Sequence, residues 1–272
     1  MKSFISCGML VGAALCLFVA CGEKEPIEMT ITAQLDARAG KAAWQSGERL
    51  NVFSLQHFKD HGSSTLSCSE AGVSVEFRSD DRIAAGDSYL FFYPVGKVET
   101  IVDGEMYVGV PTAQEAVPGG VDEGLVLLAS RAVPPIIQVV KMQNATAFVK
   151  VSLAEKLAEA ASTMILESCG GEMISGDMIV SLQRGNISAS SAGSGYRRME
   201  PSSVITMAGP FEPCKSYTFS VIPGKFSQLA LTVVSKKGTR LTTEYPMAKD
   251  ITLHPGDVLD LGILVSSYFD YD

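Results

Sequence analysis

The sequence predicts an all-β protein with little helix, built as two tandem antiparallel β-sandwich domains. Short segments with alternating apolar residues recur along the whole chain, turn-forming Gly, Pro and Asn separate them, and helix signals are scarce. The 272 residues are enough for two ordinary domains or one large one, and the number of short strands favours two. An apolar fraction of 46% is typical of a packed globule and not of a disordered stalk.

The N-terminal segment has the pattern of a secretory signal peptide. Lys2 precedes an uninterrupted apolar run from Phe4 to Ala20, and charge begins directly after Cys21. This arrangement resembles a bacterial lipoprotein signal, in which residues 1–20 are removed after Ala20 and Cys21 becomes the acylated first residue. The alternative is an uncleaved signal anchor, since the apolar run is long enough for a thin bilayer. Lipidation is favoured because an anchor needs no cysteine at its exit.

The first strand follows a short charged tether at residues 21–26. Residues 27–35 alternate apolar and polar side chains and include β-branched residues, which predicts a strand with one buried face. A turn at residues 46–47 then leads into a second strand over residues 50–53. The single tryptophan, Trp44, comes directly before this turn, so we expect it to plug the end of a core.

The rest of the first half continues this pattern. Residues 87–94 predict a buried aromatic strand that ends at Pro94. Further strands are expected at residues 73–77, 106–110, 125–129, 136–142 and 146–153.

A helix signal lies near the middle of the chain. Residues 152–155, Ser-Leu-Ala-Glu, form a capping box before a run of helix-forming residues, which predicts one or two helical turns. We place the domain boundary there, with the N-terminal domain at 27–152 and the C-terminal domain at 153–272. Strands of the second domain are expected at residues 164–167, 173–182, 204–207, 217–222, 228–235 and 240–245. Residues 186–195, almost all Ser, Ala and Gly, predict a flexible surface loop.

Charge and cysteine content exclude several classes of function. The net charge of −8 repels phosphate backbones, so nucleic acid is not an expected partner. Beyond the N-terminal segment only Cys68, Cys169 and Cys214 remain, without the C-x-x-C spacing of a metal or redox site. We expect them to be small buried residues, with a Cys169–Cys214 bridge left open.

Candidate catalytic and metal-binding residues have better structural interpretations. His57 and His61 have the spacing of a helical zinc pair, but the segment has no helix signal and no glutamate beside the first histidine. The acid pairs at 80–81 and 122–123 could serve as general acid and base, but adjacent carboxylates in turns are usually solvated. We therefore predict no enzyme activity, no catalytic residues, no metal site and no cofactor.

Several landmarks follow one another in a characteristic order. They are Cys21, Trp44-x-x-Gly47-Glu48-x-Leu50-x-Val52-Phe53, Phe92-Tyr93-Pro94, Val110-Pro111-x-x-Gln114, Leu127-Leu128-Ala129, Met173-Ile174-Ser175-Gly176, Val221-Ile222-Pro223-Gly224 and Leu253-x-Pro255-Gly256-Asp257-x-Leu259-x-Leu261-Gly262. In this order the chain resembles the fimbrillin-like lipoproteins of Gram-negative gut and oral anaerobes, which are related to type V fimbriae. The resemblance implies two transthyretin-like β-sandwich domains, a lipid anchor in the outer membrane and surface exposure. It also implies fimbrial subunits or other surface proteins as partners, bound through β-strand donation.

The resemblance also implies a cleavage site. In polymerising members an arginine-specific protease removes the first strand, and Arg38 is the candidate here because Ala and Gly around it predict an accessible loop tip. An ordinary uncut loop is the alternative. After Leu264 only residues 265–272 remain, which is short for a donor strand and favours an anchor or accessory subunit. A second hypothesis is a surface lipoprotein that binds a glycan or a peptide through loop aromatics and does not polymerise.

Overall fold

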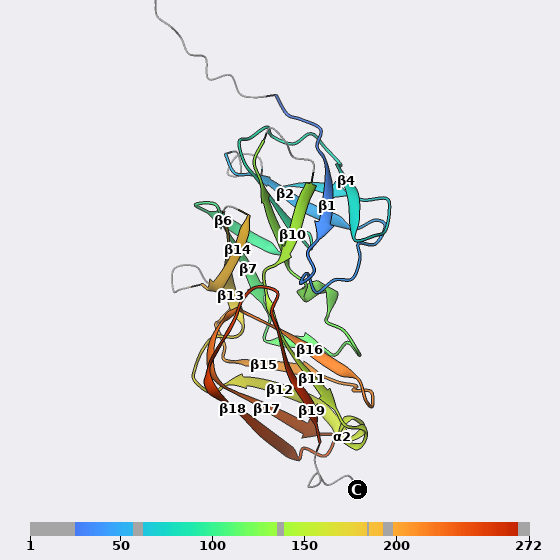
Figure 1. Cartoon of the computed structure of the whole chain (residues 1–272), viewed down its shortest axis with the longest axis vertical. Coiled ribbons are helices and arrows are strands. Elements are labelled where there is room, and N and C mark those ends of the chain that lie inside the picture. Colours follow the sequence, from blue (N-terminus) through green and yellow to red (C-terminus); the bar gives the residue numbers. More distant parts are fainter. Residues whose placement is uncertain (1–24, 57–61, 135–138, 184, 193–197, 266–272) are drawn as a thin grey trace, which may run out of the picture.

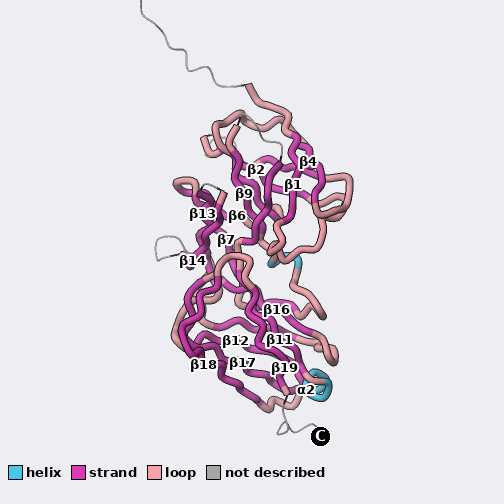
Figure 2. Tube along the Cα trace, in the orientation of Figure 1, coloured by secondary structure: helices cyan, strands magenta, loops and turns pink. Residues whose placement is uncertain are grey.

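The computed structural model describes residues 25–56, 62–134, 139–183, 185–192 and 198–265. In this part of the chain nearly all regular structure is strand. The helical elements described are the short helix α2 (Glu155–Ala160) and the 3₁₀ turn η1 (Glu123–Leu125), drawn in cyan in Figure 2. The molecule is elongated, with an upper lobe formed mainly by the first half of the chain and a lower lobe formed mainly by the second half (Figure 1). The prediction of an all-β protein with little helix is confirmed.

The upper lobe contains a closed barrel of seven strands. In order around the barrel these are β1 (Thr30–Leu35), β10 (Val139–Asn144), β9 (Leu128–Ala132), β5 (Tyr89–Tyr93), β2 (Arg49–Ser54), β3 (Ser64–Ser67) and β4 (Ser74–Ser79). Alternate residues of each strand point inward, so that Ile31 and Ala33 of β1 meet Val75 and Phe77 of β4 in one buried cluster. The strands pair antiparallel except for β1 and β10, which run parallel.

Trp44 lies fully buried in this cluster, as its position before the turn predicts. Its indole Nε1 donates a hydrogen bond to the Ala33 carbonyl at 3.1 Å, so the one polar group of the ring is satisfied. The rings of Phe77 and Tyr93 meet it edge to face, with centroids at 5.1 and 5.3 Å. Trp44 therefore joins β1, β4 and β5 from inside the barrel.

A four-stranded sheet packs against the outside of the barrel. Its strands, in order, are β14 (Asn186–Ser191), β13 (Gly176–Gln183), β7 (Glu105–Val110) and β6 (Val98–Val102). This second layer explains why β5 is apolar at every position. Its Tyr89, Phe91 and Tyr93 point into the barrel, whereas Leu90 and Phe92 face the four-stranded sheet.

The lower lobe is a sandwich of two sheets around one core. One sheet consists of β16 (Ser216–Val221), β11 (Ala147–Leu153) and β19 (Val258–Leu264). The other consists of β18 (Arg240–Leu253), β17 (Gly224–Ser235), β12 (Ala161–Ser168), β15 (Val204–Ala208) and β8 (Ala113–Glu115). Phe219 of β16, Val149 of β11 and Leu231 of β17 share the core between the sheets, and Leu157 of α2 joins them at one end.

Strands of the first half of the chain pair with strands of the second half, which the sequence pattern does not indicate. β7 of the first half pairs with β13 of the second, and β8 pairs with β15. β11 ends at the expected boundary, but both of its partners, β16 and β19, lie beyond it. The description as two antiparallel sandwiches therefore holds only in part, because the upper lobe contains a closed barrel and three strand pairs are parallel.

Two local expectations need correction. Residues 186–191 of the expected flexible loop form strand β14, because they pair with β13 over six consecutive positions. The helical turn after residue 152 is present as α2, but the capping box is not, since Ala154 is the N-cap and no side chain caps the helix. Burial of Leu157 and Ala158 in the lower core stabilises this short helix instead.

The carboxyl group of Glu99, in the four-stranded sheet, is largely buried without full hydrogen bonding. Glu99 of β6 is only 18% exposed, its Oε2 has no hydrogen-bond partner, and Arg198 Nε is 3.5 Å away. Burial, and then the negative charge of Asp177, raise the pKa of Glu99 despite the charge of Arg198. A carboxyl whose pKa is raised in the folded state lowers stability when it is ionised, and this cost disappears below its unfolded pKa near 4.3.

We therefore expect Glu99→Gln to stabilise the protein at neutral pH. The free energy of unfolding should rise by about 1 kcal/mol at pH 7, and the difference should vanish as the pH falls below about 4. Urea unfolding at several pH values measures this. The partly exposed Glu105→Gln on neighbouring β7 is the control, expected within about 0.5 kcal/mol of the parent. A loss of stability on Glu99→Gln at pH 7 would show that the ion pair with Arg198 outweighs the cost of burial.

Candidate functional site: the first strand and the Arg38 loop

The first strand is an internal member of the barrel. β1 lies between β4, which it pairs with antiparallel from Thr30 to Gln34, and β10, which it pairs with in parallel from Thr32 to Leu35. The side chains of Ile31 and Ala33 are almost completely buried. Removal of β1 would open the barrel along two strand edges and expose its apolar interior. Whether the chain is cut after β1 therefore decides which surface the molecule presents.

The loop after β1, residues 36–40, is fastened to the body of the protein. Asp36 Oδ1 accepts a hydrogen bond from the Arg38 backbone N–H at 2.9 Å, and Lys141 Nζ lies 2.7 Å from Asp36 Oδ2. The Ala39 carbonyl accepts a hydrogen bond from Asn144 Nδ2 at 2.7 Å. Ala39 itself is fully buried. An accessible loop tip was expected here, and Ala37, Arg38 and Gly40 are exposed, but Ala39 directly after the candidate bond is buried.

Gly40 explains how the loop can pack so closely. Its φ of +72° is a conformation that residues with a side chain rarely adopt. A Cβ at this position would lie 2.8 Å from the Phe148 ring of β11, so only glycine lets the backbone approach. Two of the small residues near Arg38, Ala39 and Gly40, therefore serve close packing, whereas Ala37 is exposed.

The Arg38 side chain reaches the lower lobe. Its Nη1 donates to Asp257 Oδ1 at 3.1 Å. Asp257 belongs to the turn between β18 and β19, where its Oδ2 accepts the His254 backbone N–H at 2.8 Å. Burial acts to raise the pKa of Asp257, but the hydrogen bonds from His254 and the charges of His254 and Arg38 outweigh it, so this pKa is lowered. The contact joins the loop after β1 to the second half of the chain.

A buried charge cluster follows the loop. Lys41 is only 4% exposed, and its Nζ lies 2.8 Å from Glu48 Oε1 and 5.2 Å from the Tyr93 ring centroid. The Tyr93 hydroxyl donates to the same Glu48 oxygen at 2.8 Å, and Glu123 adds a second carboxylate at 3.7 Å from Lys41 Nζ. Burial, and then the hydrogen bond and charge of Glu48, raise the pKa of Tyr93. Lys41 is thus paired mainly with the largely buried Glu48, while Glu123 remains 72% exposed. The position of this pair beside Trp44 indicates a structural role.

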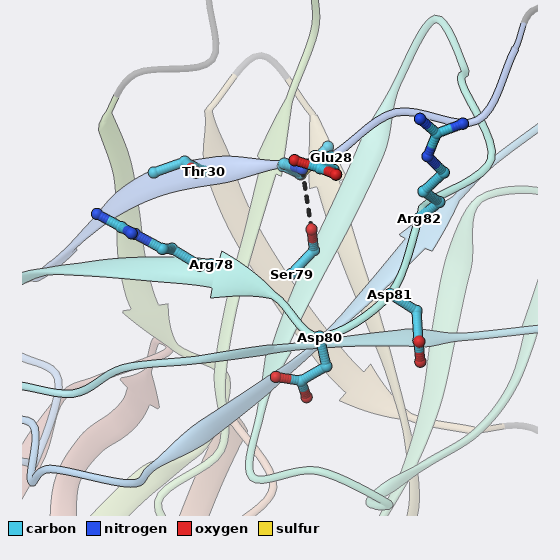
Figure 3. A pocket seen from close by; sticks show the side chains of 8 residues that line it. Glu28, Thr30, Arg78, Ser79, Asp80, Asp81 and Arg82 are labelled. Atoms are coloured by element: carbon cyan, nitrogen blue, oxygen red, sulfur yellow. Dashed lines mark hydrogen bonds between the residues drawn. The ribbon is translucent and has the colours of Figure 1, made fainter.

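One member of each acid pair makes structural contacts. Asp80 accepts hydrogen bonds from Ser67, Thr65 and Arg49, of which Ser67 contributes most to lowering its pKa. Asp80 and Asp81 line a shallow cleft of about 400 Å³, but the charged side chains around it point in different directions (Figure 3). Asp122 caps η1 by accepting the Gly124 N–H at 2.8 Å.

Other expected site residues are only partly described. Cys21, Ala20, His57 and His61 lie outside the described residues. Within the described ranges, no group of three or more His, Cys, Asp and Glu side chains could hold a metal ion. The same ranges contain no helix that is both long and apolar enough to cross a membrane.

The remaining cysteines depart in part from expectation. Cys68 is buried, whereas Cys169 and Cys214 are exposed, and none of the three forms a disulfide. The possible Cys169–Cys214 bridge is therefore not formed. Both exposed residues lie in loops beyond strand ends, where the alternation of buried positions no longer applies.

Sequence reasoning missed the residues that hold the Arg38 loop in place. Asn144 ends β10 and is 98% buried, with its Oδ1 accepting both the N–H and the hydroxyl of Thr146 at 2.9 Å. An asparagine within an apolar segment is the available signal, because a buried amide needs partners. Its partner Ala39 is distant in sequence and could not have been identified from the pattern.

Comparison with known proteins gives a likeness at the level of structure alone. No family model matches the chain, and no curated protein matches it. A protein of Bacteroides ovatus described as a "putative cell adhesion protein" has 14% identity and a TM-score of 0.54, with 88% of this chain and 92% of that chain covered. A protein of Bacteroides uniformis with the same description has 12% identity and a TM-score of 0.55, with 88% and 93% covered.

A third structure is more distant. The tip fimbrial protein Mfa3 of Porphyromonas gingivalis, with a C-terminal truncation, has 9% identity and a TM-score of 0.41, with 85% of each chain covered. At 12–14% identity, the likeness to the two Bacteroides structures establishes the fold alone. The chain has the fold of the two Bacteroides proteins, in agreement with its resemblance to the fimbrillin-like family.

Proposed function

We propose that the protein is a cell-surface lipoprotein with a fimbria-related adhesive role, held in the outer membrane by lipid on Cys21. The descriptions of the two Bacteroides proteins as cell adhesion proteins support an adhesive role. The lipoprotein signal and the fimbrillin-like motifs support the anchor and the fimbrial partners. In this proposal the two halves of the chain correspond to the transthyretin-like units of the family, and partner subunits associate by β-strand donation.

The tertiary contacts of the Arg38 loop are the main support for an anchor or accessory subunit over a subunit that is cut to polymerise. A protease needs several residues around the cut bond in an extended, accessible conformation, and here Ala39 is buried and its carbonyl is bound by Asn144. Cleavage after Arg38 would also separate the fold from Cys21 unless β1 stayed paired. The proposed molecule therefore keeps β1 and its lipid.

The glycan-binding alternative is less well supported. Stacking of a sugar needs an exposed aromatic ring. Among the side chains that the structure describes, every Phe, Tyr and Trp is buried except Tyr107, which is half-buried.

Substitution of the lipid-bearing residue tests the proposed anchor. We expect Cys21→Ser to leave an unprocessed precursor and to remove the acyl chains, because serine has no thiol to form the thioether to the lipid. At about 0.8 kcal/mol per buried methylene, two or more chains make attachment effectively permanent in the parent. Detergent partitioning and intact-mass measurement of both proteins check this. An unmodified Cys21 in the mature parent would contradict the proposal.

A further inference from the structure

The free edges of the sheets are protected in different ways. β16 ends its sheet, but the Gln114 amide covers this edge: Nε2 donates to the Ser220 carbonyl at 2.7 Å, and Oε1 accepts the Ser220 N–H at 2.9 Å. The Gly119 N–H covers the Ser216 carbonyl at 2.8 Å. An uncovered edge is a template for pairing with another chain, so a cover of this kind prevents strand addition.

The other edge strands have different protection. The pairings of β6, β18 and β19 with their neighbours each contain a register shift. β8 has only three residues. Register shifts and short length both weaken the regular ladder that an incoming strand needs.

β14 has none of these features. It pairs with β13 over six consecutive residues without a shift, and its sequence, Asn-Ile-Ser-Ala-Ser-Ser, contains neither charge nor proline. Within the described parts of the chain no strand pairs with its other side. β14 is thus a regular edge without a cover.

The direction of its backbone groups follows from one hydrogen bond. The Ala192 N–H, just after β14, donates to the Asp177 carbonyl at 2.8 Å and so points toward β13. Backbone groups alternate along an antiparallel strand. Those of Ser188 and Ser190 therefore also point toward β13, and those of Ile187, Ala189 and Ser191 point toward the free edge.

A groove of about 470 Å³ runs along this edge, within the size range of binding pockets. β14 lines one side of it from Asn186 to Ser190. Arg38 and Gln143 of the upper lobe, and residues 223–225 and 252–255 of the lower lobe, line the others. Figure 1 shows β14 beside β10, above the lower lobe. Walls from both lobes favour a single extended segment over the edge of a second folded sheet.

The charge of the groove indicates the kind of segment. Arg38 and Lys225 line it, and no carboxylate residue is among those that line it, although the whole chain carries a net charge of −8. The Arg38 and Lys225 side chains are 64% and 66% exposed, and each pairs with one carboxylate of this chain, Asp257 and Asp250. A guanidinium has five N–H donors and an ammonium has three, so each cation keeps donors beyond its present partner. An extended segment with carboxylate side chains can use these remaining donors.

We propose that β14 accepts an extended, acidic segment of a partner protein, which becomes a fifth strand of the four-stranded sheet. The outward backbone groups of Ile187, Ala189 and Ser191 supply the hydrogen bonds, and Lys225 and Arg38 bind the carboxylates. The inference rests on the proposed function in using strand addition, and it names the accepting edge and the chemistry of the partner.

Amide hydrogen exchange with a synthetic peptide tests this site. The probe is a capped peptide of alternating valine and aspartate, and the control peptide has lysine in place of aspartate. We expect the aspartate peptide to slow exchange at the N–H groups of Ile187, Ala189 and Ser191 in the full chain. Lys225→Glu should shift the preference toward the lysine peptide.

Two substitutions of one residue separate backbone pairing from other effects. Ala189→Pro removes an outward N–H at an edge position that tolerates proline, whereas Ala189→Ser keeps this N–H. Binding of the aspartate peptide should weaken at least about tenfold in Ala189→Pro and stay unchanged in Ala189→Ser. Thermal melting of both variants verifies the fold.

Three outcomes would overturn the inference. One is the absence of protection at the β14 edge, and another is equal binding by Ala189→Pro and Ala189→Ser. The third is a dimer of the free protein that Ala189→Pro dissociates, which would assign the edge to a second copy. Protection along a different strand, without protection of β14, is a case of the first outcome: it rejects β14 and leaves strand addition at another edge possible. None of these results bears on the lipid at Cys21.

Discussion

Trp44→Ala should cost about 3–5 kcal/mol of unfolding free energy, the usual range for truncating a fully buried tryptophan. The loss has two parts. The indole fills the space between Phe77 and Tyr93, and its removal leaves a cavity in the barrel. It also leaves the buried Ala33 carbonyl without the hydrogen bond that Trp44 Nε1 donates. A loss of this size is comparable to the whole stability of a marginal domain.

Urea unfolding followed by circular dichroism measures this loss, and Trp44→Phe is the matched control. Phenylalanine keeps an aromatic ring and lacks the indole N–H, so its cost should lie well below that of alanine. The chain contains a single tryptophan, so parent fluorescence reports on this site alone. It should resist quenching by iodide. Parent-like melting of Trp44→Ala together with ready quenching of the parent would show that the residue is not a core plug.

Asn144→Ala should make the bond after Arg38 much easier to cut. The substitution removes the hydrogen bond that Asn144 Nδ2 donates to the Ala39 carbonyl, and this carbonyl is then buried without a partner. Leaving such a group unsatisfied costs about 1–3 kcal/mol. Because each 1.4 kcal/mol is a factor of ten, local opening and cleavage should become about ten to a hundred times faster. Digestion with an arginine-specific protease, followed by mass spectrometry, measures the rate at this bond.

Two further variants sharpen the test. Asn144→Asp keeps the acceptor for Thr146 but loses the donor for Ala39, so it should accelerate cleavage as Asn144→Ala does. Lys141→Gln removes the ion pair with Asp36 but leaves the hydrogen bond from Asn144 to Ala39 in place. The Lys141 side chain is 62% exposed, and pairs with such an exposed partner contribute little, so the cleavage rate should stay within a few-fold of the parent. Equal rates in the parent and in Asn144→Ala would mean that Asn144 does not protect the loop.

The local sequence pattern was sufficient to predict most strands, but it did not show which strands pair with one another. The alternation of apolar residues in β1 and the aromatic run of β5 identify these strands directly. The barrel, however, is closed by pairs such as Thr32 with Val139, which are far apart in sequence and have no local signal. β14 was misread because its Ser and Ala residues are typical of loops, and only its pairing with β13 makes it a strand.

At the candidate site, too, the sequence identified a residue but not its tertiary contacts. Arg38 was identified from its position after the first strand. The neighbouring small residues were read as a sign of accessibility, but small size also permits close packing. Ala39 is buried and Gly40 approaches Phe148. Whether small residues indicate accessibility or close packing depends here on the tertiary contacts of the loop with Asn144 and Asp257, and the local sequence does not show these contacts.

The N-terminus of the protein isolated from intact cells tests the central claim most directly. The claim is that a lipid on Cys21 anchors the molecule and that β1 and the Arg38 loop remain in place. Mass spectrometry of the N-terminal peptide should then find an acylated Cys21 and a continuous chain through the bond between Arg38 and Ala39. A mature chain that begins at Ala39 would contradict the claim and would identify a subunit that is cut to polymerise.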